Sequence, residues 1–276
     1  MFRRELLAIV RPRTSDTGGL VYAGGIDDDD MIVGGKVRSP TSGETYEVKN
    51  GYLDLLKGRV GADNVANLTN FLPGAGPAYE PLWRVHSLTL LTGERFPSDR
   101  ELRIIFDFVG LERGGRYLDL GCSAGLYTRS LARMLDYRGE VVGIDISPFM
   151  LKEAARRAQK IGAKPSFVRA DAHNIPFADA NFSGAVCGGT LNELGDPARA
   201  LRETRRILEP GGHLAIMGIL RTRTPRGRLL QRLLSIGGVR FFDPDELKSL
   251  LDHAGFDPDP LQTHDLIFFA AATRRG

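Results

Sequence analysis

The stretch YLDLGCSAGLY, residues 117–127, decides the fold. A strand-like apolar run ends at Leu120, a turn of small residues with Gly121, Ser123 and Gly125 follows, and a helical pattern then begins. Small residues let a backbone approach a ligand closely, and the first turn of a helix offers N–H groups. Because such turns serve many ligands, the stretch predicts a binding turn without naming its ligand.

Strands and helices alternate from residue 115 onward. Strands are predicted at 116–120, 140–145, 165–170, 184–187 and 213–220, and helices at 124–135, 148–161 and 198–208. This alternation is typical of a parallel sheet with helices on both faces. A helix near 244–254 and an antiparallel pair, 258–263 with 266–272, complete the chain. The fold class is therefore α/β, with a doubly wound, mostly parallel sheet.

Two aspartates follow later strands of this pattern. Asp145 ends the second strand, twenty residues after Gly125, where a carboxylate in a βαβ unit accepts hydrogen bonds from ribose hydroxyls. Asp171 follows the third strand and is placed for the other end of the same nucleoside. Either residue alone could instead be a helix cap or a loop residue, but their common register favours a nucleotide site.

The serious competitor is an NAD-binding domain, which shares the strand, the turn and the acid. The turn here reads Gly-x-x-x-Gly, not G-x-G-x-x-G, and Asp119 stands two residues before its first glycine. Both features argue against a nicotinamide cofactor.

The chain from Tyr117 to its end resembles the class I S-adenosylmethionine (SAM)-dependent methyltransferases, especially the ubiquinone and menaquinone C-methyltransferases. The matching pieces are LDLGCSAGLYTRSLA, VVGIDISPFML, FVRADAHNIPFADANFSGAVCGGTLNEL and RALRETRRILEPGGHLAIMGIL, in the family's order. The resemblance implies a seven-stranded Rossmann-like sheet and SAM as the cofactor. Serine at position 123 replaces a commoner glycine.

The resemblance also implies which residues contact the cofactor. Asp119 and Gly121 would hold the methionine end, Asp145 the ribose, and Asp171 with the Ala172 amide the adenine. Gly188 and Thr190, which follow the fourth strand, would line the sulfonium and substrate side. The complete predicted set is Asp119, Gly121, Ser123, Gly125, Asp145, Ile146, Asp171, Ala172, Gly188 and Thr190.

Methyl transfer from a sulfonium is an in-line displacement, so positioning and exclusion of water supply much of the rate. Whether a general base is needed depends on the acceptor atom. The catalytic candidates are Glu193, Tyr127 and His86, with Asn192 as a further pocket residue. Glu193 follows the fourth strand, where ligands bind in such sheets, and is equally consistent with a solvated loop acid. A histidine such as His86, in a helical segment, more often packs than reacts.

The predicted organisation is a β-rich, ribbon-like appendage at 1–58, a helical linker or lid at 59–112 and a SAM-binding domain at 113–276. The appendage resembles the zinc ribbon that begins some related methyltransferases, including a ribosomal RNA guanine methyltransferase. Its turns read RPRT at 11–14 and SPTS at 39–42, so no cysteine thiolate is present and a metal-free ribbon is predicted. The four aspartates at 27–30 predict a solvated hairpin tip.

Composition limits the location and the partners. The 276 residues carry a formal net charge of +3, which does not call for a nucleic-acid partner. No apolar run is long enough to span a bilayer, and no secretory signal is evident. Cys122 and Cys187 are too few for a disulfide framework. We therefore expect a cytoplasmic protein.

The segment from Arg221 to Arg240 is the main clue to the substrate, because it holds six arginines and no acid, interleaved with leucines. It could clamp an anionic group, rest on an anionic membrane, contact RNA phosphates, or be an exposed basic helix without function. The near-neutral chain and the ribbon without metal ligands argue against RNA.

The predicted function is SAM-dependent methylation of a small lipophilic or anionic metabolite. The alternatives are a ribosomal RNA methyltransferase, or a protein that binds SAM without methylating, such as a cyclase or a binding subunit. The methyl acceptor and the oligomeric state stay open.

Overall fold

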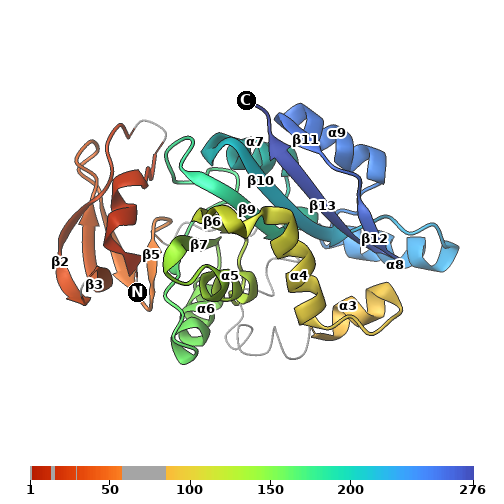
Figure 1. The fold of residues 1–276 in the computed structure, drawn as a ribbon, viewed down its shortest axis with the longest axis horizontal. Helices are drawn as coiled ribbons and strands as arrows, with labels where there is room; N and C mark the ends of the chain where they lie inside the picture. The colour runs from red at the N-terminus through yellow and green to blue at the C-terminus, as the bar shows by residue number, and fades with distance from the viewer. Residues whose placement is uncertain (1, 14–15, 29, 58–84) are drawn as a thin grey trace.

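Parallel strands form the centre of the sheet. In the computed structural model, which describes residues 2–13, 16–28, 30–57 and 85–276, β6 (Gly115–Leu120) lies between β7 (Gly139–Asp145) and β9 (Phe182–Gly188) (Figure 1). β8 (Ser166–Arg169) extends the sheet beyond β7, and β10 (Leu208–Ile219) extends it beyond β9. Side chains on both faces of these strands are buried, as expected for a parallel sheet covered by helices.

Antiparallel strands complete the C-terminal side of the sheet. β13 (Ile267–Arg274) pairs antiparallel with β10, and the short strands β11 (Phe256–Pro258) and β12 (Gln262–His264) pair antiparallel with β13. The order in this part is β8-β7-β6-β9-β10-β13-β11. The predicted α/β fold is confirmed, and this part of the sheet is mostly parallel, as predicted; the N-terminal strands, described below, make the whole sheet a mixed one. From β6 the chain adds β7 and β8 on one side, and then β9 and β10 on the other side. Ligands bind at such a switch point, here between β6 and β9, in doubly wound sheets.

Helices cover both faces of the sheet. One face packs against α3 (Val85–Thr92), α4 (Ser98–Val109) and α5 (Leu126–Leu135), and α6 (Pro148–Lys160) continues this layer over β8. The other face packs against α7 (Pro197–Ile207) and α9 (Pro244–Ala254). The remaining helical elements are η4 (Leu111–Arg113), η5 (Asp136–Arg138), η6 (Thr190–Asn192) and α8 (Pro225–Ile236).

Several helices begin at a capping residue followed by proline. The Ser147 hydroxyl accepts a hydrogen bond from Met150 N at 3.2 Å at the start of α6, and the Asp196 carboxylate accepts one from Arg199 N at 2.9 Å at the start of α7. These caps satisfy N–H groups that have no partner within the helix, and proline suits the first helical position. They explain why the predicted starts of α6 and α7 lie within one residue of the observed ones.

The N-terminal segment joins the same sheet through the strands β1 (Phe2–Arg3), β2 (Val21–Asp28), β3 (Met31–Arg38), β4 (Thr45–Lys49) and β5 (Tyr52–Asp54). The short helix η1 (Arg4–Ile9) follows β1. β5 runs parallel to β8, with Leu53 opposite Val168, so the described chain forms one thirteen-stranded sheet. The sheet is wider than predicted because β5 covers the edge of β8, which would otherwise expose unpaired backbone groups. The boundary at residue 58 stays a prediction.

The two turns compared with a zinc ribbon carry a polar network. Ser39 Oγ donates to Asp16 Oδ1 at 3.2 Å, Arg13 Nε donates to Glu44 Oε2 at 3.1 Å, and Tyr46 also donates to Glu44. The described residues contain no cluster of three or more His, Cys, Asp or Glu side chains able to hold a metal. Thr14, the last residue of the first turn, lies outside the described residues.

Two further expectations concern the N-terminal half. In the β2–β3 hairpin Asp28 lies opposite Met31, so the predicted tip at the aspartates is confirmed. Of the predicted helical segment 59–112, residues 58–84 lie outside the described part of the chain, and α3 and α4 are the helices described. None of the described helices is long and apolar enough to cross a bilayer.

Candidate functional site

The turn after β6 requires glycine at two positions. Gly121 and Gly125 have φ values of +67° and +77°, in the left-handed region, and Ser123 shares this region with a φ of +48°. A Cβ atom on Gly121 would lie 2.3 Å from Thr190 Oγ1, and one on Gly125 would lie 2.8 Å from the Ala154 Cβ. Packing within the protein therefore requires glycine at both positions, whether or not a ligand also approaches the backbone there.

Asp145, at the end of β7, holds this turn against the start of α6. Its Oδ2 accepts a hydrogen bond from Ser123 N at 2.8 Å, its Oδ1 accepts one from Ser147 N at 2.8 Å, and Ile146 N is a third backbone donor. Burial raises the pKa of Asp145 above its usual value. A carboxylate offers about four acceptor positions, so Asp145 retains capacity for a further donor such as a ribose hydroxyl.

Asp119 lies within β6 and is buried beneath the same turn. Its Oδ2 accepts hydrogen bonds from Thr128 N at 2.9 Å and from Thr128 Oγ1 at 2.6 Å. The carboxylate thus binds an N–H of the first turns of α5, where a negative charge is also favoured by the helix dipole. Its contact with the methionine end of a cofactor stays a prediction.

Asp171 is held by His173, a residue that the sequence did not single out. Asp171 Oδ1 accepts hydrogen bonds from His173 N and from His173 Nδ1, both at 2.8 Å. Burial raises the pKa of Asp171, but these hydrogen bonds lower it further, so the net pKa lies below the usual value. His173 Nε2 faces the Asp196 N–H at 3.3 Å, which places the proton on Nδ1. The Asp171–Ala172 turn is thereby fixed to the start of α7.

Gly188 and Thr190 bring the end of β9 to the turn after β6. Thr190 Oγ1 donates to the Gly121 carbonyl at 3.1 Å. A Cβ on Gly188 would lie 2.5 Å from the Tyr127 ring, so only glycine fits there. The structure thus brings the predicted residues of the first and fourth strands together.

The predicted catalytic residue Tyr127 is buried, and its hydroxyl donates to Glu101 Oε1 of α4. This contact joins α5 to α4, which favours a packing role for the tyrosine. Glu101 was not found from the sequence, although it is the acid on a buried helix face shared with Ile105 and Val109. His86 lies in α3, and its side chain lies outside the described residues. The catalytic assignments stay predictions.

Glu193 directly follows η6, beside the end of β9. Burial, together with the negative charge of Asp145, raises the pKa of Glu193 to about 7. Its neighbour Asn192 donates from Nδ2 to the Ile219 carbonyl at 2.9 Å and to the Arg240 carbonyl at 2.6 Å. Asn192 is therefore a structural link, whereas Glu193 has the pKa of an acid–base group that works near neutrality.

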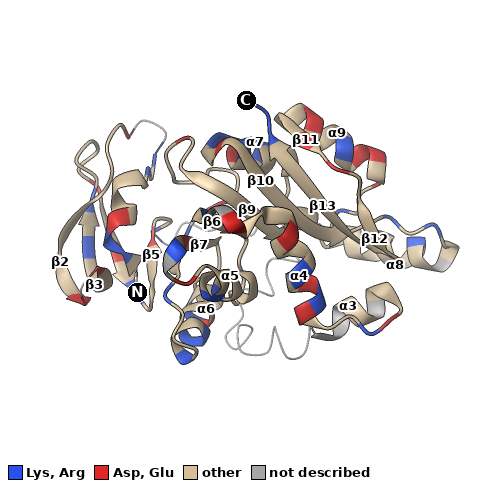
Figure 2. Cartoon of the chain, viewed as in Figure 1, with Lys and Arg blue, Asp and Glu red and all other residues tan. Residues whose placement is uncertain are grey.

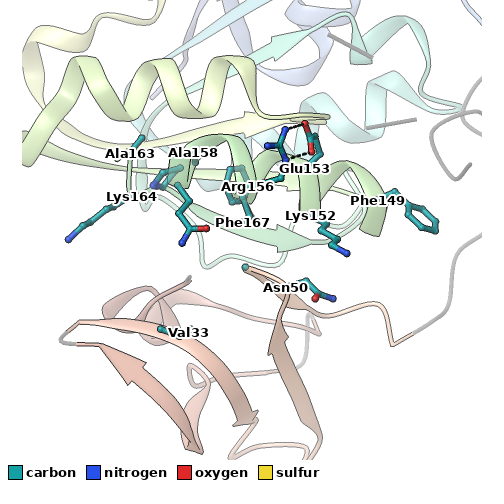
Figure 3. A pocket seen from close by; sticks show the side chains of 14 residues that line it. Val33, Asn50, Phe149, Lys152, Glu153, Arg156, Ala158, Ala163, Lys164 and Phe167 are labelled. Atoms are coloured by element: carbon teal, nitrogen blue, oxygen red, sulfur yellow. Dashed lines mark hydrogen bonds and ion pairs between the residues drawn. The ribbon is translucent and has the colours of Figure 1, made fainter. Parts of the chain in front are cut away.

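A separate groove of about 570 Å³ lies between the N-terminal ribbon strands and α6 (Figure 3). Val33 and Asn50 line one wall, and α6 supplies the other wall, with Lys152 among its residues. Figure 3 shows Arg156 held by Glu153, whereas Lys152 makes no ion pair within the described part of the chain. None of the predicted site residues lines this groove, so it is distinct from the candidate site.

Comparisons with known proteins define the class of the domain. Residues 118–216 match the methyltransferase domain family. The chain is 38% identical over 122 residues to the 2-phytyl-1,4-naphtoquinone methyltransferase of Nostoc punctiforme, covering 44% of this chain and 53% of that protein. It thus spans about half the length of this curated relative.

Solved structures agree on the fold. A phosphoethanolamine N-methyltransferase from Haemonchus contortus, in complex with S-adenosylhomocysteine, superposes with a TM-score of 0.62 at 17% identity, covering 79% of this chain and 61% of the other. The [4+2]-cyclase SpnF superposes with a TM-score of 0.58 at 20% identity, covering 72% and 94%. At these identities the likeness concerns the fold alone.

Residues 118–216 thus match a methyltransferase domain, as predicted, and the chain has the fold of the SAM-dependent methyltransferases. Within that class, its sequence is similar to the quinone methyltransferases.

Proposed function

We propose that this protein binds SAM at the carboxyl edge of its central strands and transfers the methyl group to a small lipophilic or anionic metabolite. The observation that carries the proposal is the hydrogen-bonded unit of Asp145 and Ser123 N, with Asp145 at the end of β7 and Ser123 in the turn after β6. An acid at this place, beside the reversal point of the sheet, suits the ribose of a nucleoside.

The fit of the cofactor rests on the donors and acceptors available. Asp145 retains acceptor capacity for a hydroxyl, and Asp171 presents a carboxylate whose orientation is set by His173. We assign the ten predicted cofactor residues to this cofactor and the region beside Gly188 and Thr190 to the methyl and the acceptor. SAM, when bound, supplies an electrophilic methyl group.

The chain's own contribution to the reaction is positioning and proton transfer. Asp145 and Thr190 bind the turn between β6 and α5 directly, and Asp119 joins β6 to α5 across it, so a bound cofactor meets a preorganised site. We assign Glu193, with a pKa of about 7, as the general base. It would take up the proton that a methyl acceptor such as a hydroxyl group loses when it is methylated.

The substrate class follows from the chemistry of the relative and of the segment from Arg221 to Arg240. The Nostoc relative is named for a phytyl naphthoquinone, a lipophilic ring compound. Exposed leucines and arginines give α8 an apolar and cationic surface. We therefore propose a lipophilic acceptor, and include in the proposal a membrane contact through this segment and a cytoplasmic location, with which the buried free thiols of Cys122 and Cys187 are consistent.

Calorimetric titration with SAM tests the cofactor site. Asp145→Ala is expected to weaken SAM binding at least about tenfold, since a buried hydrogen bond to a charged group and the support of the turn are both lost. Asp107→Ala, which removes an exposed aspartate of α4, is the matched control and should bind as the wild type does. No SAM binding by the wild type would overturn the proposal.

A second candidate is a protein that binds SAM without methylating. The superposition on a [4+2]-cyclase motivates this alternative, although it concerns only the fold. Formation of S-adenosylhomocysteine with quinone or phenol acceptors distinguishes the two. Tight SAM binding without any product across a broad acceptor panel would favour the cyclase or binding-subunit alternative. Methylation of RNA, rather than of small molecules, would favour the ribosomal alternative.

A further inference from the structure

The helix α8 is attached to the protein by a polar side. Gln231 is buried, its Oε1 accepts a hydrogen bond from Thr222 N at 2.9 Å, and its Nε2 donates to the Leu220 carbonyl at 2.9 Å. Gly227 packs against Thr222 closely enough that a Cβ would lie 2.6 Å from its methyl group. Gln231 and Gly227 therefore lie on the face of α8 that meets the protein.

The opposite side of α8 is apolar and exposed. Leu229, Leu233 and Ile236 are 62%, 59% and 82% exposed. Their spacing of four and three residues places them on one stripe of the helix. A surface helix usually turns such a stripe towards the core, so α8 has the reverse orientation. Exposed apolar side chains gathered in this way mark a surface that another apolar phase covers.

The charges around the stripe are positive and available. Arg228 and Arg232 lie on α8, Arg223 precedes it, and these exposed side chains make no ion pair within the residues that the structure describes. Figure 2 shows no acidic residue on α8.

Two arginines of the same segment are already neutralised. Arg221 lies 3.4 Å from Asp243, and Arg240 pairs with Glu246, so both contact residues at the start of α9. The cationic surface that is free to bind a partner is therefore smaller than the whole segment from Arg221 to Arg240, and it centres on α8.

We propose that α8 is a docking element for an anionic lipid bilayer. The stripe of Leu229, Leu233 and Ile236 enters the boundary between headgroups and acyl chains, and the arginines contact lipid phosphates. A second copy of the chain fits this surface less well, because a symmetric contact through α8 would bring Arg228 and Arg232 against like charges.

The position of α8 connects docking to the candidate site. The segment that contains α8 follows the end of β10 at Ile219 and extends to Arg240, and Asn192 donates hydrogen bonds to the carbonyls of both residues. Glu193 is the next residue. Docking would therefore set the acceptor side of the site beside the bilayer, so that an acceptor dissolved in lipid has a short path to it. This step rests on the proposed SAM-dependent methyl transfer, whereas the docking itself does not.

Vesicle flotation of the full chain, without SAM or acceptor, tests the docking. We expect binding to vesicles of phosphatidylcholine with phosphatidylglycerol, and weaker binding to phosphatidylcholine alone. The triple variant L229S/L233S/I236S should bind the anionic vesicles at least about tenfold more weakly. R228Q/R232Q should lose about fivefold per arginine and most of the salt dependence.

The matched control is V21S/I26S, which removes two apolar side chains of β2 that are 55% and 70% exposed. This variant should bind vesicles as the wild type does. Thermal unfolding of all variants should match the wild type, because the altered side chains are exposed.

Three results would overturn the proposal. They are absence of wild-type binding to anionic vesicles, equal binding by the triple variant, and a dimer in solution that the triple variant dissolves while no form binds vesicles. Because SAM titration is measured separately, failure of docking and failure of the proposed SAM binding are distinguishable.

Discussion

Asp54 and Arg169 form a buried ion pair that joins the N-terminal ribbon strands to the cofactor edge of the sheet. Arg169 Nη1 lies 3.3 Å from both carboxylate oxygens of Asp54, and Arg169 Nε donates to the Ile146 carbonyl at 3.0 Å. Ile146 directly follows Asp145. One guanidinium therefore connects the last strand of the ribbon with the loop that positions the candidate ribose ligand.

The first prediction is that Asp54→Ala destabilises the protein by about 3–5 kcal/mol, because it leaves the buried Arg169 without its carboxylate. Urea unfolding measures this change. The control Asp99→Ala removes an exposed pair with Arg103 on α4 and should cost at most about 1 kcal/mol. If the two variants lose equal stability, the pair does not hold the ribbon to the sheet.

The second prediction compares two glycines with almost the same backbone conformation. Gly121 has a φ of +67° and Gly162 has a φ of +69°, but a Cβ would clash with Thr190 only at Gly121, since nothing lies within 4 Å of it at Gly162. Gly162→Ala should cost about 1 kcal/mol from the left-handed backbone alone. Gly121→Ala should cost about 1–3 kcal/mol more from overpacking, and should also weaken SAM binding. Equal losses in thermal unfolding would mean that the contact with Thr190 relaxes freely.

The central strands and their helices could be predicted because their signals are local. Each strand is a short apolar run, and capping residues such as Ser147 and Asp196 indicate where the following helices begin. The same locality made Asp145 and the glycine turn recognisable, because the acid and the turn occupy consecutive strand ends of one βαβ unit.

The attachment of the ribbon could not be predicted, because it depends on residues far apart in the chain. β5 has three residues, and its partner Arg169 lies 115 positions after Asp54. The orientation of α8 was hidden for a similar reason. The sequence indicates an amphipathic basic helix, but only the hydrogen bonds of Gln231 with Thr222 and Leu220 decide which side faces the protein.

Within the candidate site, the sequence could not separate ligand contacts from internal contacts. The carboxylate of Asp119 caps α5, and the hydroxyl of Tyr127 binds Glu101. Both partners become neighbours only in the folded chain. His173 follows Asp171 by two residues, but its role in linking Asp171 to the start of α7 depends on the hydrogen bond from the Asp196 N–H to its ring, which the folded structure shows.

The third prediction separates packing from catalysis at Tyr127. Tyr127→Phe removes the donor to a buried carboxylate oxygen of Glu101, and should cost about 1–3 kcal/mol of stability. Tyr22→Phe is the control, because within the described structure the Tyr22 hydroxyl is buried without a hydrogen-bond partner, so its removal should be neutral or stabilising. A packing role leaves kcat within about threefold of the wild type under conditions where the variant is folded. A loss of kcat of about a hundredfold or more, with KM unchanged, would instead assign Tyr127 to the chemical step.

The fourth prediction concerns the pH dependence that Glu193 introduces. Its pKa is about 7 in the folded protein and 4.5 for an ordinary glutamate, so between these values the folded state holds a proton that the unfolded state has released. Stability therefore falls as the pH rises from 4.5 to 7, by on the order of 2 kcal/mol from this group.

Glu193→Gln removes that dependence, because glutamine does not titrate. Urea unfolding across this pH range should show the variant gaining stability relative to the wild type as the pH rises, with the difference complete above about pH 7. If Glu193 is also the base, the wild-type rate of methyl transfer should rise with pH through about 7, and the variant should lose this rise. Thr190→Ser is a suitable neighbouring control, because it keeps the hydroxyl bonded to Gly121 and leaves the titrating group in place. A pH-independent stability difference between wild type and Glu193→Gln would show that the carboxylate is solvated, and would remove the physical basis for assigning it a proton.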